Sequence, residues 1–174
     1  LPNRSQMHER LEEMVIAAQQ NDTHIAVLFL DLDRFKPIND SMGHPAGDRV
    51  LQEVAARLRA CIKKQDLVSR MSGDEFTIAI SDQKTADDAA NTAVKIGERI
   101  LYALQQPFLI EQRELFLTGS IGIAIFPHDG QTVTELLKNS DMAMYHAKDV
   151  GRNSVQFFDQ EMNEKAVYLI ETVS

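Results

Sequence analysis

The sequence is short of cysteine and of long apolar runs. Its single cysteine, Cys61, excludes an internal disulfide, and its position in a helical pattern beside Val54 and Leu58 predicts a buried thiol. No apolar run approaches the roughly 18 residues that a membrane span needs, and no signal peptide opens the chain. We therefore expect a cytoplasmic domain, or the cytoplasmic part of a membrane protein.

Positive charge is also scarce, with 18 Lys and Arg residues against 26 Asp and Glu residues and a net charge of −8. Proteins bind polyanions mainly through clustered Lys and Arg side chains, so the sequence predicts no nucleic-acid partner. An anionic small molecule is compatible with this charge, because a divalent metal and a few local cations can reverse the field inside one pocket. The sequence also lacks a Walker-type phosphate loop, a zinc motif and the order of a Ser-His-Asp triad.

Apolar residues make up 44% of the 174 residues, which is enough for the core of one domain. Their spacing predicts helices over residues 7–21, 34–40, 47–64, 86–104, 133–147 and 160–170. Strands are predicted over residues 24–33, 66–71, 76–80, 107–111, 115–126 and 155–158, with the second and third forming one hairpin and the fourth and fifth another. Strands paired by hairpins, with helices between them, indicate an α+β fold with a mostly antiparallel sheet.

The predicted strand 115–126 has two unlike faces. One face carries three isoleucines and the other only small residues, namely Ile121, Ile123 and Ile125 against Ser120, Gly122 and Ala124. Small residues leave room for close approach of another backbone. We therefore expect a helix to pack closely on the second face.

The tip of the first predicted hairpin carries two acids, Asp74 and Glu75. Ser72 and Glu75 also have the spacing of a helix capping box, but the residues that follow have strand composition, which favours the hairpin. Acids on a hairpin tip often only face water. They need partners from elsewhere in the chain before the tip can be given a function.

A third acid, Asp31, ends a nearly continuous apolar run that is typical of a central strand buried on both faces. If this strand lies beside the hairpin, Asp31 comes close to Asp74 and Glu75, and three crowded carboxylates repel one another unless a cation lies among them. Mg²⁺ is the natural candidate, because it binds one or two carboxylates together with phosphate oxygens and water. The pattern therefore favours phosphoryl or nucleotidyl transfer. The alternative is that these acids are solvated strand ends and that Asp33 caps the next helix.

Lys148 and Arg152 lie four residues apart near the end of a predicted helix, so both side chains can reach one anion. Arg70 is a third candidate donor, and Gly73 would let the backbone approach a ligand closely. Taken alone, each cation is more simply a surface charge, which the helix dipole favours at a helix end. Together with the acids, they indicate a phosphate site.

Asn39 and Asp48 flank the turn Gly43-His44-Pro45. An Asn amide and an Asp carboxylate can together bind the donor and acceptor edge of guanine, although both residues are also common in caps and turns. His44 is interpreted as structural rather than catalytic.

These segments resemble the GGDEF domain of the diguanylate cyclase family, in the family's order and over nearly the whole chain. The resemblance rests on Leu1-Pro2-Asn3-Arg4 and on the segments 31–40, 43–48, 70–76, 120–124, 143–148 and 151–153. It implies a fold like that of nucleotidyl cyclases and polymerase palms. In such a fold a ferredoxin-like core contains a five-stranded, mostly antiparallel sheet, flanked by helices, with an active-site β-hairpin.

The resemblance also assigns roles to residues. Asp31 and Asp74, with the backbone carbonyl of Leu32, would bind Mg²⁺ or Mn²⁺. The catalytic turn would contain Gly73, Asp74 and Glu75, and Glu75 would assist deprotonation or metal binding. The substrate-binding residues would be Asn39 and Asp48 at guanine, Lys148 and Arg152 at the terminal phosphates, and Phe35, Lys36 and His44 in addition.

In this family, two subunits each hold one GTP and meet face to face. Each 3′-hydroxyl attacks the α-phosphorus of the partner's GTP, so the products are cyclic di-GMP and two pyrophosphates. The resemblance therefore implies a homodimer with GTP as substrate and cyclic di-GMP as product.

The sequence departs from the family pattern at three points. Ser72 stands where the motif opens with glycine, a change with which family members can be active. The product-inhibition motif Arg-x-x-Asp is replaced by Lys63-Lys64-Gln65-Asp66. Lysine keeps the charge but loses the planar fork of arginine, so we expect weak or absent inhibition at Lys63 and Asp66. The Asp-x-Leu-Thr segment expected ahead of Leu1 is missing, which indicates a chain cut from a longer protein.

Residues 157–166 resemble the connector that joins a GGDEF domain to a following EAL phosphodiesterase domain. We therefore expect a GGDEF domain at 1–158, a connector helix at 159–174 and a covalently linked EAL domain in the full-length protein. Two functions follow. The chain is an active diguanylate cyclase, or it is a GTP-binding module, weak or inactive as a catalyst, that regulates the EAL domain. A cyclic di-GMP receptor is disfavoured by Lys63.

Overall fold

The computed structural model describes residues 1–164, so the end of the predicted connector, residues 165–174, lies outside the described part of the chain. The helices are α1 (Arg4–Asn21), α2 (Phe35–Met42), α3 (His44–Cys61), α4 (Ala86–Gln105) and α5 (Val133–Asp149). The strands are β1 (His24–Leu32), β2 (Leu67–Ser72), β3 (Glu75–Gln83), β4 (Phe108–Ile110), β5 (Arg113–Leu115), β6 (Gly119–Phe126) and β7 (Ser154–Phe157). Residues 160–164 are helical. Within residues 1–164, no helix combines the length and apolar character that a membrane crossing requires.

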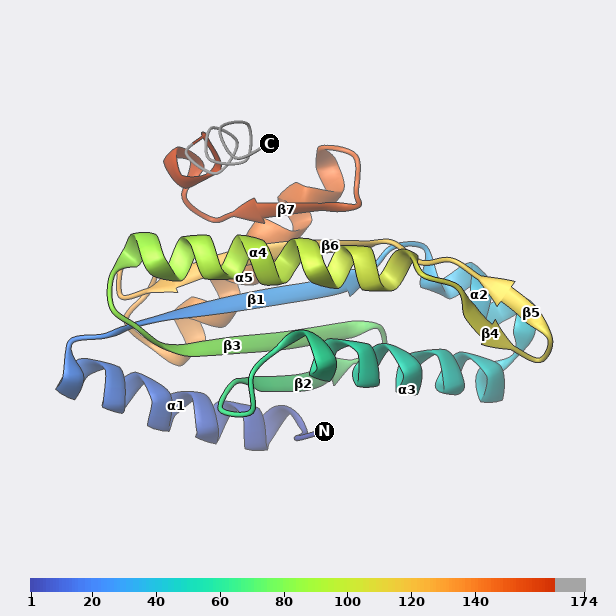
Figure 1. Ribbon diagram of the computed structural model, residues 1–174, viewed down its shortest axis with the longest axis horizontal. Helices are drawn as coiled ribbons and strands as arrows, with labels where there is room; N and C mark the ends of the chain where they lie inside the picture. Colours follow the sequence, from blue (N-terminus) through green and yellow to red (C-terminus); the bar gives the residue numbers. More distant parts are fainter. Residues whose placement is uncertain (165–174) are drawn as a thin grey trace.

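Strand β1 is the centre of a five-stranded sheet in the order β2-β3-β1-β6-β7 (Figure 1). It pairs antiparallel with β3 and β6, and β3 pairs antiparallel with β2. Strand β7, at the other edge, runs parallel to β6. The predicted α+β fold with a mostly antiparallel, five-stranded sheet is therefore confirmed, and one parallel pair makes the sheet mixed.

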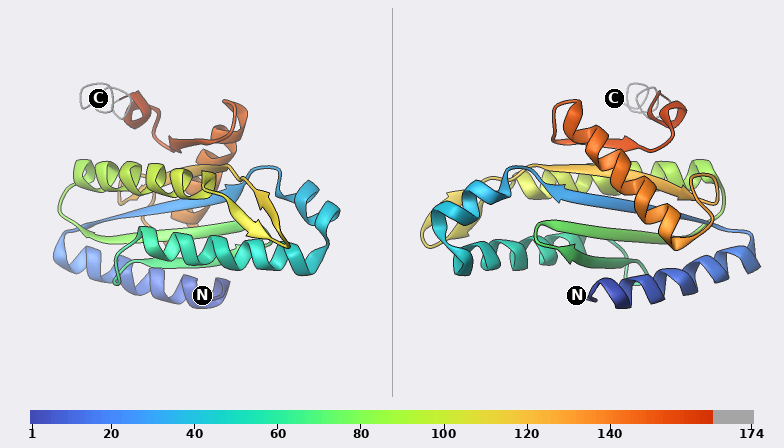
Figure 2. Two further views of the ribbon diagram at one scale, coloured as in Figure 1. Left: turned by 45° about the vertical axis from the view of Figure 1, so that its right-hand side comes forward. Right: turned by 180° about the vertical axis from the view of Figure 1, so that it is seen from behind.

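Helices cover both faces of the sheet (Figures 1 and 2). Helices α3 and α4 lie on one face, where Val54 and Ile100 share a core with Leu28 of β1. Helices α1 and α5 lie on the other face, where Leu136 shares a core with Val27 of β1. Neighbouring residues of β1 thus point into opposite cores, which is why the strand is apolar along nearly its whole length.

Helix α5 approaches β6 closely because Gly122 has no side chain. A β-carbon at this position would lie 2.1 Å from both the backbone nitrogen of Met144 and the carbonyl oxygen of Ser140. The predicted close packing of a helix on this face is therefore confirmed. The same packing carries the end of α5 to the end of β1, where Lys148 contacts Asp31.

The predicted second hairpin is wrong in one respect. Strands β4 and β5 pair with each other in a small sheet of their own, and the chain leaves the strand conformation before β6 joins the main sheet. Buried Leu117 explains the break, because its N–H donates to the carbonyl oxygen of Leu104 in α4. Arg57 of α3 anchors the small sheet by donating to the carbonyl oxygen of Pro107 (2.7 Å) and lying 3.6 Å from the centroid of the Phe108 ring.

Three helix starts also differ from the prediction. Helix α1 begins at Arg4 instead of residue 7, because the Asn3 side chain caps it by accepting from the backbone nitrogen of Gln6. Helix α3 begins at His44 instead of Gly47, because Pro45 fits the first turn, where a missing N–H costs no hydrogen bond. Helix α2 begins at Phe35 after Arg34, which has a left-handed φ of 54° and provides no side-chain cap. At the other end of α3, Cys61 is a buried free thiol, as predicted.

Candidate active site

Strands β2 and β3 form the predicted hairpin, and the capping-box alternative is wrong. Gly73 in the turn has a φ of 47°, which glycine adopts without strain. The Ser72 Oγ donates a hydrogen bond to Glu75 Oε1 (2.9 Å), and the Arg70 Nε donates to the carbonyl oxygen of Gly73 (2.8 Å). Arg70, a candidate phosphate donor, therefore braces the turn, while Ser72 fixes the Glu75 carboxylate.

The end of β1 lies directly beside this turn. Asp31 is opposite Glu75 in the β1–β3 register, and the N–H of Leu32 donates to the carbonyl oxygen of Asp74 (3.2 Å). Leu32 itself is buried at the strand end. The structure therefore brings the three predicted acids, Asp31, Asp74 and Glu75, to one edge of the sheet.

Asp31 is the most buried of these acids, at 9% exposed. Its Oδ2 pairs with Lys148 Nζ at 2.7 Å, whereas its Oδ1 is buried and has no hydrogen-bond partner within residues 1–164. Burial raises the pKa of Asp31. The hydrogen bond from Lys148 offsets part of this rise, and the Asp74 carboxylate adds to it. The position is therefore unfavourable for a charged carboxylate unless further positive charge is present.

The unpartnered Oδ1 of Asp31 tests whether these residues suit a divalent cation. A buried carboxylate oxygen without a donor is costly unless a ligand supplies positive charge. The carboxylates of Asp74 and Glu75 lie close by, and oxygen atoms of this kind are the preferred ligands of Mg²⁺ and Mn²⁺. The residues therefore fit a divalent cation, with Asp31 and Asp74 as candidate ligands beside the backbone of Leu32.

Helix α5 supplies the cationic side of the site. Lys148, in its last turn, has a side chain that is 24% exposed and reaches Asp31. Arg152 follows in the loop after the helix, exposed and with a left-handed φ of 65°. The sequence predicts that both cations face one anion, whereas the structure pairs Lys148 with an acid. A phosphate that bound here would compete with Asp31 for the charge of Lys148.

Asp33 holds the loop of Arg152 in place, and the alternative that it caps a helix is wrong. The Asp33 carboxylate is 5% exposed and accepts three hydrogen bonds. Its Oδ2 accepts from Thr118 Oγ1 (2.7 Å) and from the backbone nitrogen of Asn153 (3.0 Å), and its Oδ1 accepts from Ser120 Oγ (2.7 Å). One buried side chain therefore ties β1, β6 and the loop after α5 together.

The predicted guanine-binding residues gather at the junction of α2 and α3. Asn39 Nδ2 lies 3.1 Å from His44 Nδ1, and a β-carbon at Gly47 would lie 2.1 Å from Asn39 Oδ1. Gly47 therefore makes room for the Asn39 amide, and Asp48, the next residue of α3, is exposed. His44 orients Asn39, in keeping with a structural role.

The remaining predicted residues have mixed surroundings. Phe35 is buried in the core beneath the α2–α3 junction, and its neighbour Lys36 is exposed. Lys63 is exposed, whereas Asp66 is buried and its Oδ2 accepts a hydrogen bond from the backbone nitrogen of Lys63 (3.1 Å). Burial raises the pKa of Asp66, and this hydrogen bond partly offsets the rise. The Asp66 carboxylate thus stabilises the turn formed by residues 63–66.

Asp141 of α5 belongs to the site, although the sequence analysis does not single it out. Its Oδ1 is buried and has no hydrogen-bond partner among the described residues. Burial raises the pKa of Asp141, and the charges of the nearby Glu75 and Asp31 carboxylates raise it further. A sequence signal exists, because Asp141 and Lys148 are seven residues apart and share one face of the helix.

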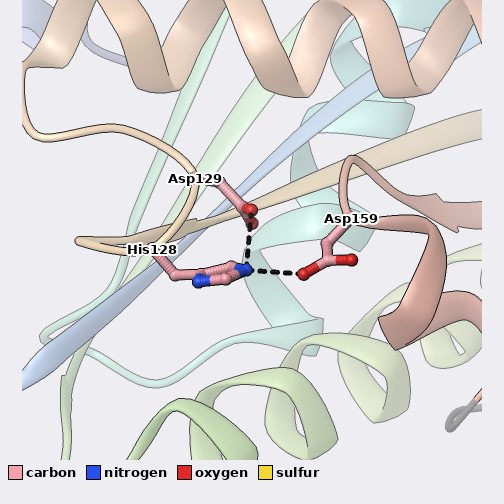
Figure 3. Close-up of side chains that lie close together, drawn as sticks. All are labelled: His128, Asp129 and Asp159. Carbon is pink, nitrogen blue, oxygen red and sulfur yellow. Dashed lines mark hydrogen bonds and ion pairs between the residues drawn. The ribbon is translucent and has the colours of Figure 1, made fainter.

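A second polar cluster, formed by His128, Asp129 and Asp159, lies beyond the opposite end of β6 (Figure 3). His128 Nε2 lies 2.5 Å from Asp159 Oδ2 and 3.8 Å from Asp129 Oδ1. The other carboxylate oxygens accept hydrogen bonds from the backbone nitrogens of Glu161 and Ile125. The three ligand atoms lie within 4.8 Å of one another, as a metal site requires, but these hydrogen bonds already account for their positions. The cluster ties the start of the predicted connector to the turn after β6.

Comparison with known proteins agrees with this geometry. The sequence matches the family described as "Diguanylate cyclase, GGDEF domain" over residues 1–154. Over 166 residues it is 46% identical to the bifunctional diguanylate cyclase/cyclic di-GMP phosphodiesterase MucR and 36% identical to the cyclic di-GMP phosphodiesterase NbdA, both from Pseudomonas aeruginosa. Each alignment covers 95% of this chain but only 24% of MucR and 21% of NbdA, so the chain spans less than a quarter of these relatives.

A solved structure shows the same fold. The GGDEF domain of TpbB, also called YfiN, from Pseudomonas aeruginosa superposes on the protein with a TM-score of 0.85 at 38% identity. The superposition covers 90% of this chain and 96% of that domain. Because the family match also contains every site residue from Asp31 to Arg152, the chain belongs to the GGDEF family of diguanylate cyclase domains.

Proposed function

We propose that the domain is an active diguanylate cyclase that condenses two GTP molecules into cyclic di-GMP and two pyrophosphates. The observation that carries the proposal is the buried, unpartnered Oδ1 of Asp31, which lies among the carboxylates of Asp74 and Glu75 and opposite Lys148. An arrangement of acids with one adjacent cation suits a site that binds a metal ion and a polyphosphate together.

Asp31 and Asp74 would hold Mg²⁺ or Mn²⁺, with the backbone carbonyl of Leu32. When bound, such an ion polarises the phosphoryl group and stabilises charge on the attacking and leaving oxygens. Lys148 and Arg152 bind the terminal phosphates and orient the α-phosphorus. Lys148 is already at the acidic edge of the site, and Asp33 fixes the loop that carries Arg152.

Asn39 and Asp48 bind the edge of guanine, with His44 holding the Asn39 amide in place. Each subunit presents one GTP, and a homodimer brings the two nucleotides face to face. In each half-reaction a bond forms between O3′ and the partner's α-phosphorus, the bond from that phosphorus to the bridging oxygen breaks, and pyrophosphate leaves. Glu75 takes up the proton of the 3′-hydroxyl.

The serine at the opening of the motif is compatible with this activity. Ser72 is exposed, and its hydroxyl donates to Glu75 Oε1 at 2.9 Å, so the side chain orients the carboxylate without filling the turn. Product inhibition at Lys63 and Asp66 is weak or absent for two reasons. The Asp66 carboxylate already accepts a hydrogen bond from the backbone nitrogen of Lys63, and lysine lacks the planar, forked guanidinium group of arginine. We place the domain in the cytoplasm, where GTP is supplied.

A second candidate is a GTP-binding module that regulates an adjacent EAL phosphodiesterase domain. Two observations favour it. Relatives named as phosphodiesterases are several times longer than the matched region, and the His128–Asp159 contact couples the domain to the connector. In both candidates we propose a GGDEF domain at residues 1–158 and a connector at 159–174.

Product formation by a dimerised protein tests the proposal. The domain, fused to a dimerising coiled coil, is incubated with GTP and Mg²⁺, and cyclic di-GMP and pyrophosphate are measured, with Asp74→Ala as control. A dimer that binds GTP yet releases no pyrophosphate would refute the cyclase. The second candidate then requires that GTP change the phosphodiesterase activity of the full-length protein, and unchanged activity without GTP would refute it.

A further inference from the structure

The active-site edge contains a fourth carboxylate, Asp141, for which neither the residue roles implied by the family resemblance nor the mechanism above has a use. It extends from α5, which packs on β6 through Gly122 and carries Lys148 further along the same face. The other three acids come from strands β1 and β3 and from the turn before β3, whereas Asp141 comes from a helix that packs on the sheet.

Asp141 does not have the surroundings of an ordinary surface acid. Its Oδ1 is fully buried, yet no hydrogen-bond donor contacts this oxygen and no ion pair includes the residue within residues 1–164. The nearby charges that act on it are those of Glu75 and Asp31, both of them negative. A buried oxygen facing like charges is unfavourable in the free protein and is not explained by packing.

Lys148 does not remove this imbalance. Its ammonium group contacts Asp31 Oδ2 at 2.7 Å, and one positive charge cannot neutralise four carboxylates. The free site is therefore short of positive charge, and the Oδ1 atoms of both Asp31 and Asp141 are buried without hydrogen-bond partners among the described residues. Electrostatic attraction for a divalent cation would include a contribution from Asp141.

We propose that Asp141 is a positioning residue that strengthens the binding of the divalent cation held by Asp31 and Asp74, through its charge and by accepting a hydrogen bond from water on the ion. The inference rests on the proposed function, because it takes that cation to be the one used with GTP. Asp141 thus retains the ion before the nucleotide adds its own phosphate ligands.

Titration with Mn²⁺ alone, followed by the electron paramagnetic resonance signal of the free ion, tests the inference. Asp141→Asn removes the charge with little change in shape and should bind Mn²⁺ about tenfold more weakly than the unaltered protein. Glu98→Gln removes an exposed acid of α4, on the other face of the sheet. Its Mn²⁺ affinity should stay within about twofold of that of the unaltered protein. Asp141→Glu restores the charge and should recover most of the affinity.

Thermal unfolding without metal provides the second readout. Because Asp141→Asn relieves repulsion among acids, its melting temperature should equal or exceed that of the unaltered protein, whereas a purely structural acid would lower it on removal. Equal Mn²⁺ affinity in Asp141→Asn, an Asp141→Glu variant as weak as Asp141→Asn, or a protein that binds no Mn²⁺ would each overturn the inference.

The two proposals fail separately in these experiments. No GTP enters the Mn²⁺ titration, so a protein that makes no cyclic di-GMP but loses Mn²⁺ affinity in Asp141→Asn refutes the cyclase and supports the role of Asp141. Equal Mn²⁺ affinities in a protein that makes cyclic di-GMP refute the role of Asp141 and support the cyclase.

Discussion

Replacing Lys148 with methionine should change metal binding and nucleotide binding in opposite directions. In the free domain, Lys148 Nζ lies 2.7 Å from Asp31 Oδ2 and supplies the positive charge beside that carboxylate. Methionine keeps the apolar stem of the side chain and removes its charge. We expect Mn²⁺ alone to bind more tightly to the variant, because the ion no longer competes with an internal cation. GTP should bind more weakly, because a phosphate contact is lost.

The size of the effect follows from the geometry of the pair. Two unit charges about 4 Å apart at an effective dielectric constant of about 20 attract each other by about 4 kcal/mol. The side chains of Lys148 and Asp31 are only 24% and 13% exposed, so solvent screens them little, but desolvation and side-chain ordering offset roughly half of the attraction. The remaining ~2 kcal/mol corresponds to about 30-fold tighter binding of Mn²⁺. The affinity for GTP should fall by a similar factor, because Lys148 no longer contacts a phosphate.

Two titrations measure these changes. Calorimetry with Mn²⁺ alone gives the metal affinity, and a fluorescent GTP derivative in excess Mg²⁺ gives the nucleotide affinity. Lys138→Met, which removes an exposed lysine from the same helix, is the matched control and should leave both affinities within about twofold. Unchanged or weaker Mn²⁺ binding by Lys148→Met would refute the reasoning, because Lys148 would then not compete for Asp31.

Three further predictions concern the motif, the connector and the sheet. Ser72→Gly removes the hydrogen bond to Glu75, and cyclic di-GMP formation measured by chromatography should fall by less than about tenfold; complete loss would show that Glu75 depends on the serine. Asp159 raises the pKa of His128, so their contact stabilises the fold fully below the ordinary value of 6.5 and less as the pH rises through the raised value. Asp159→Asn should remove this decline from a plot of melting temperature against pH, and an unchanged slope would contradict the pairing. Gly122→Ala places a β-carbon 2.1 Å from the backbone of α5 and should lower the free energy of unfolding by about 3 kcal/mol, as denaturant titration would show; an unchanged unfolding midpoint would mean that α5 does not pack so closely.

Much of the fold could be predicted because its signals are local. The apolar run of β1 predicts a strand buried on both faces, and the structure has cores on both sides of it. The alternation of residues 120–125 predicts a helix packed on the small face, which Gly122 confirms. The composition of residues 116–118 predicts a strand that the structure does not form. The N–H of Leu117 instead donates to Leu104 of α4, and strand composition does not reveal such a long-range contact.

By itself, the sequence determined which elements form, where the acidic turn lies and, through its motifs, which family the chain resembles. Only the tertiary structure decided the partners of each charge. In the folded protein Lys148 pairs with Asp31, and the Asp33 carboxylate holds the loop of Arg152 through the backbone of Asn153. Asp141 lies near other acids. The physical reason is that periodicity and turn chemistry act between residues a few positions apart. The surroundings of a carboxylate depend instead on strand order and on how closely a helix packs across the sheet.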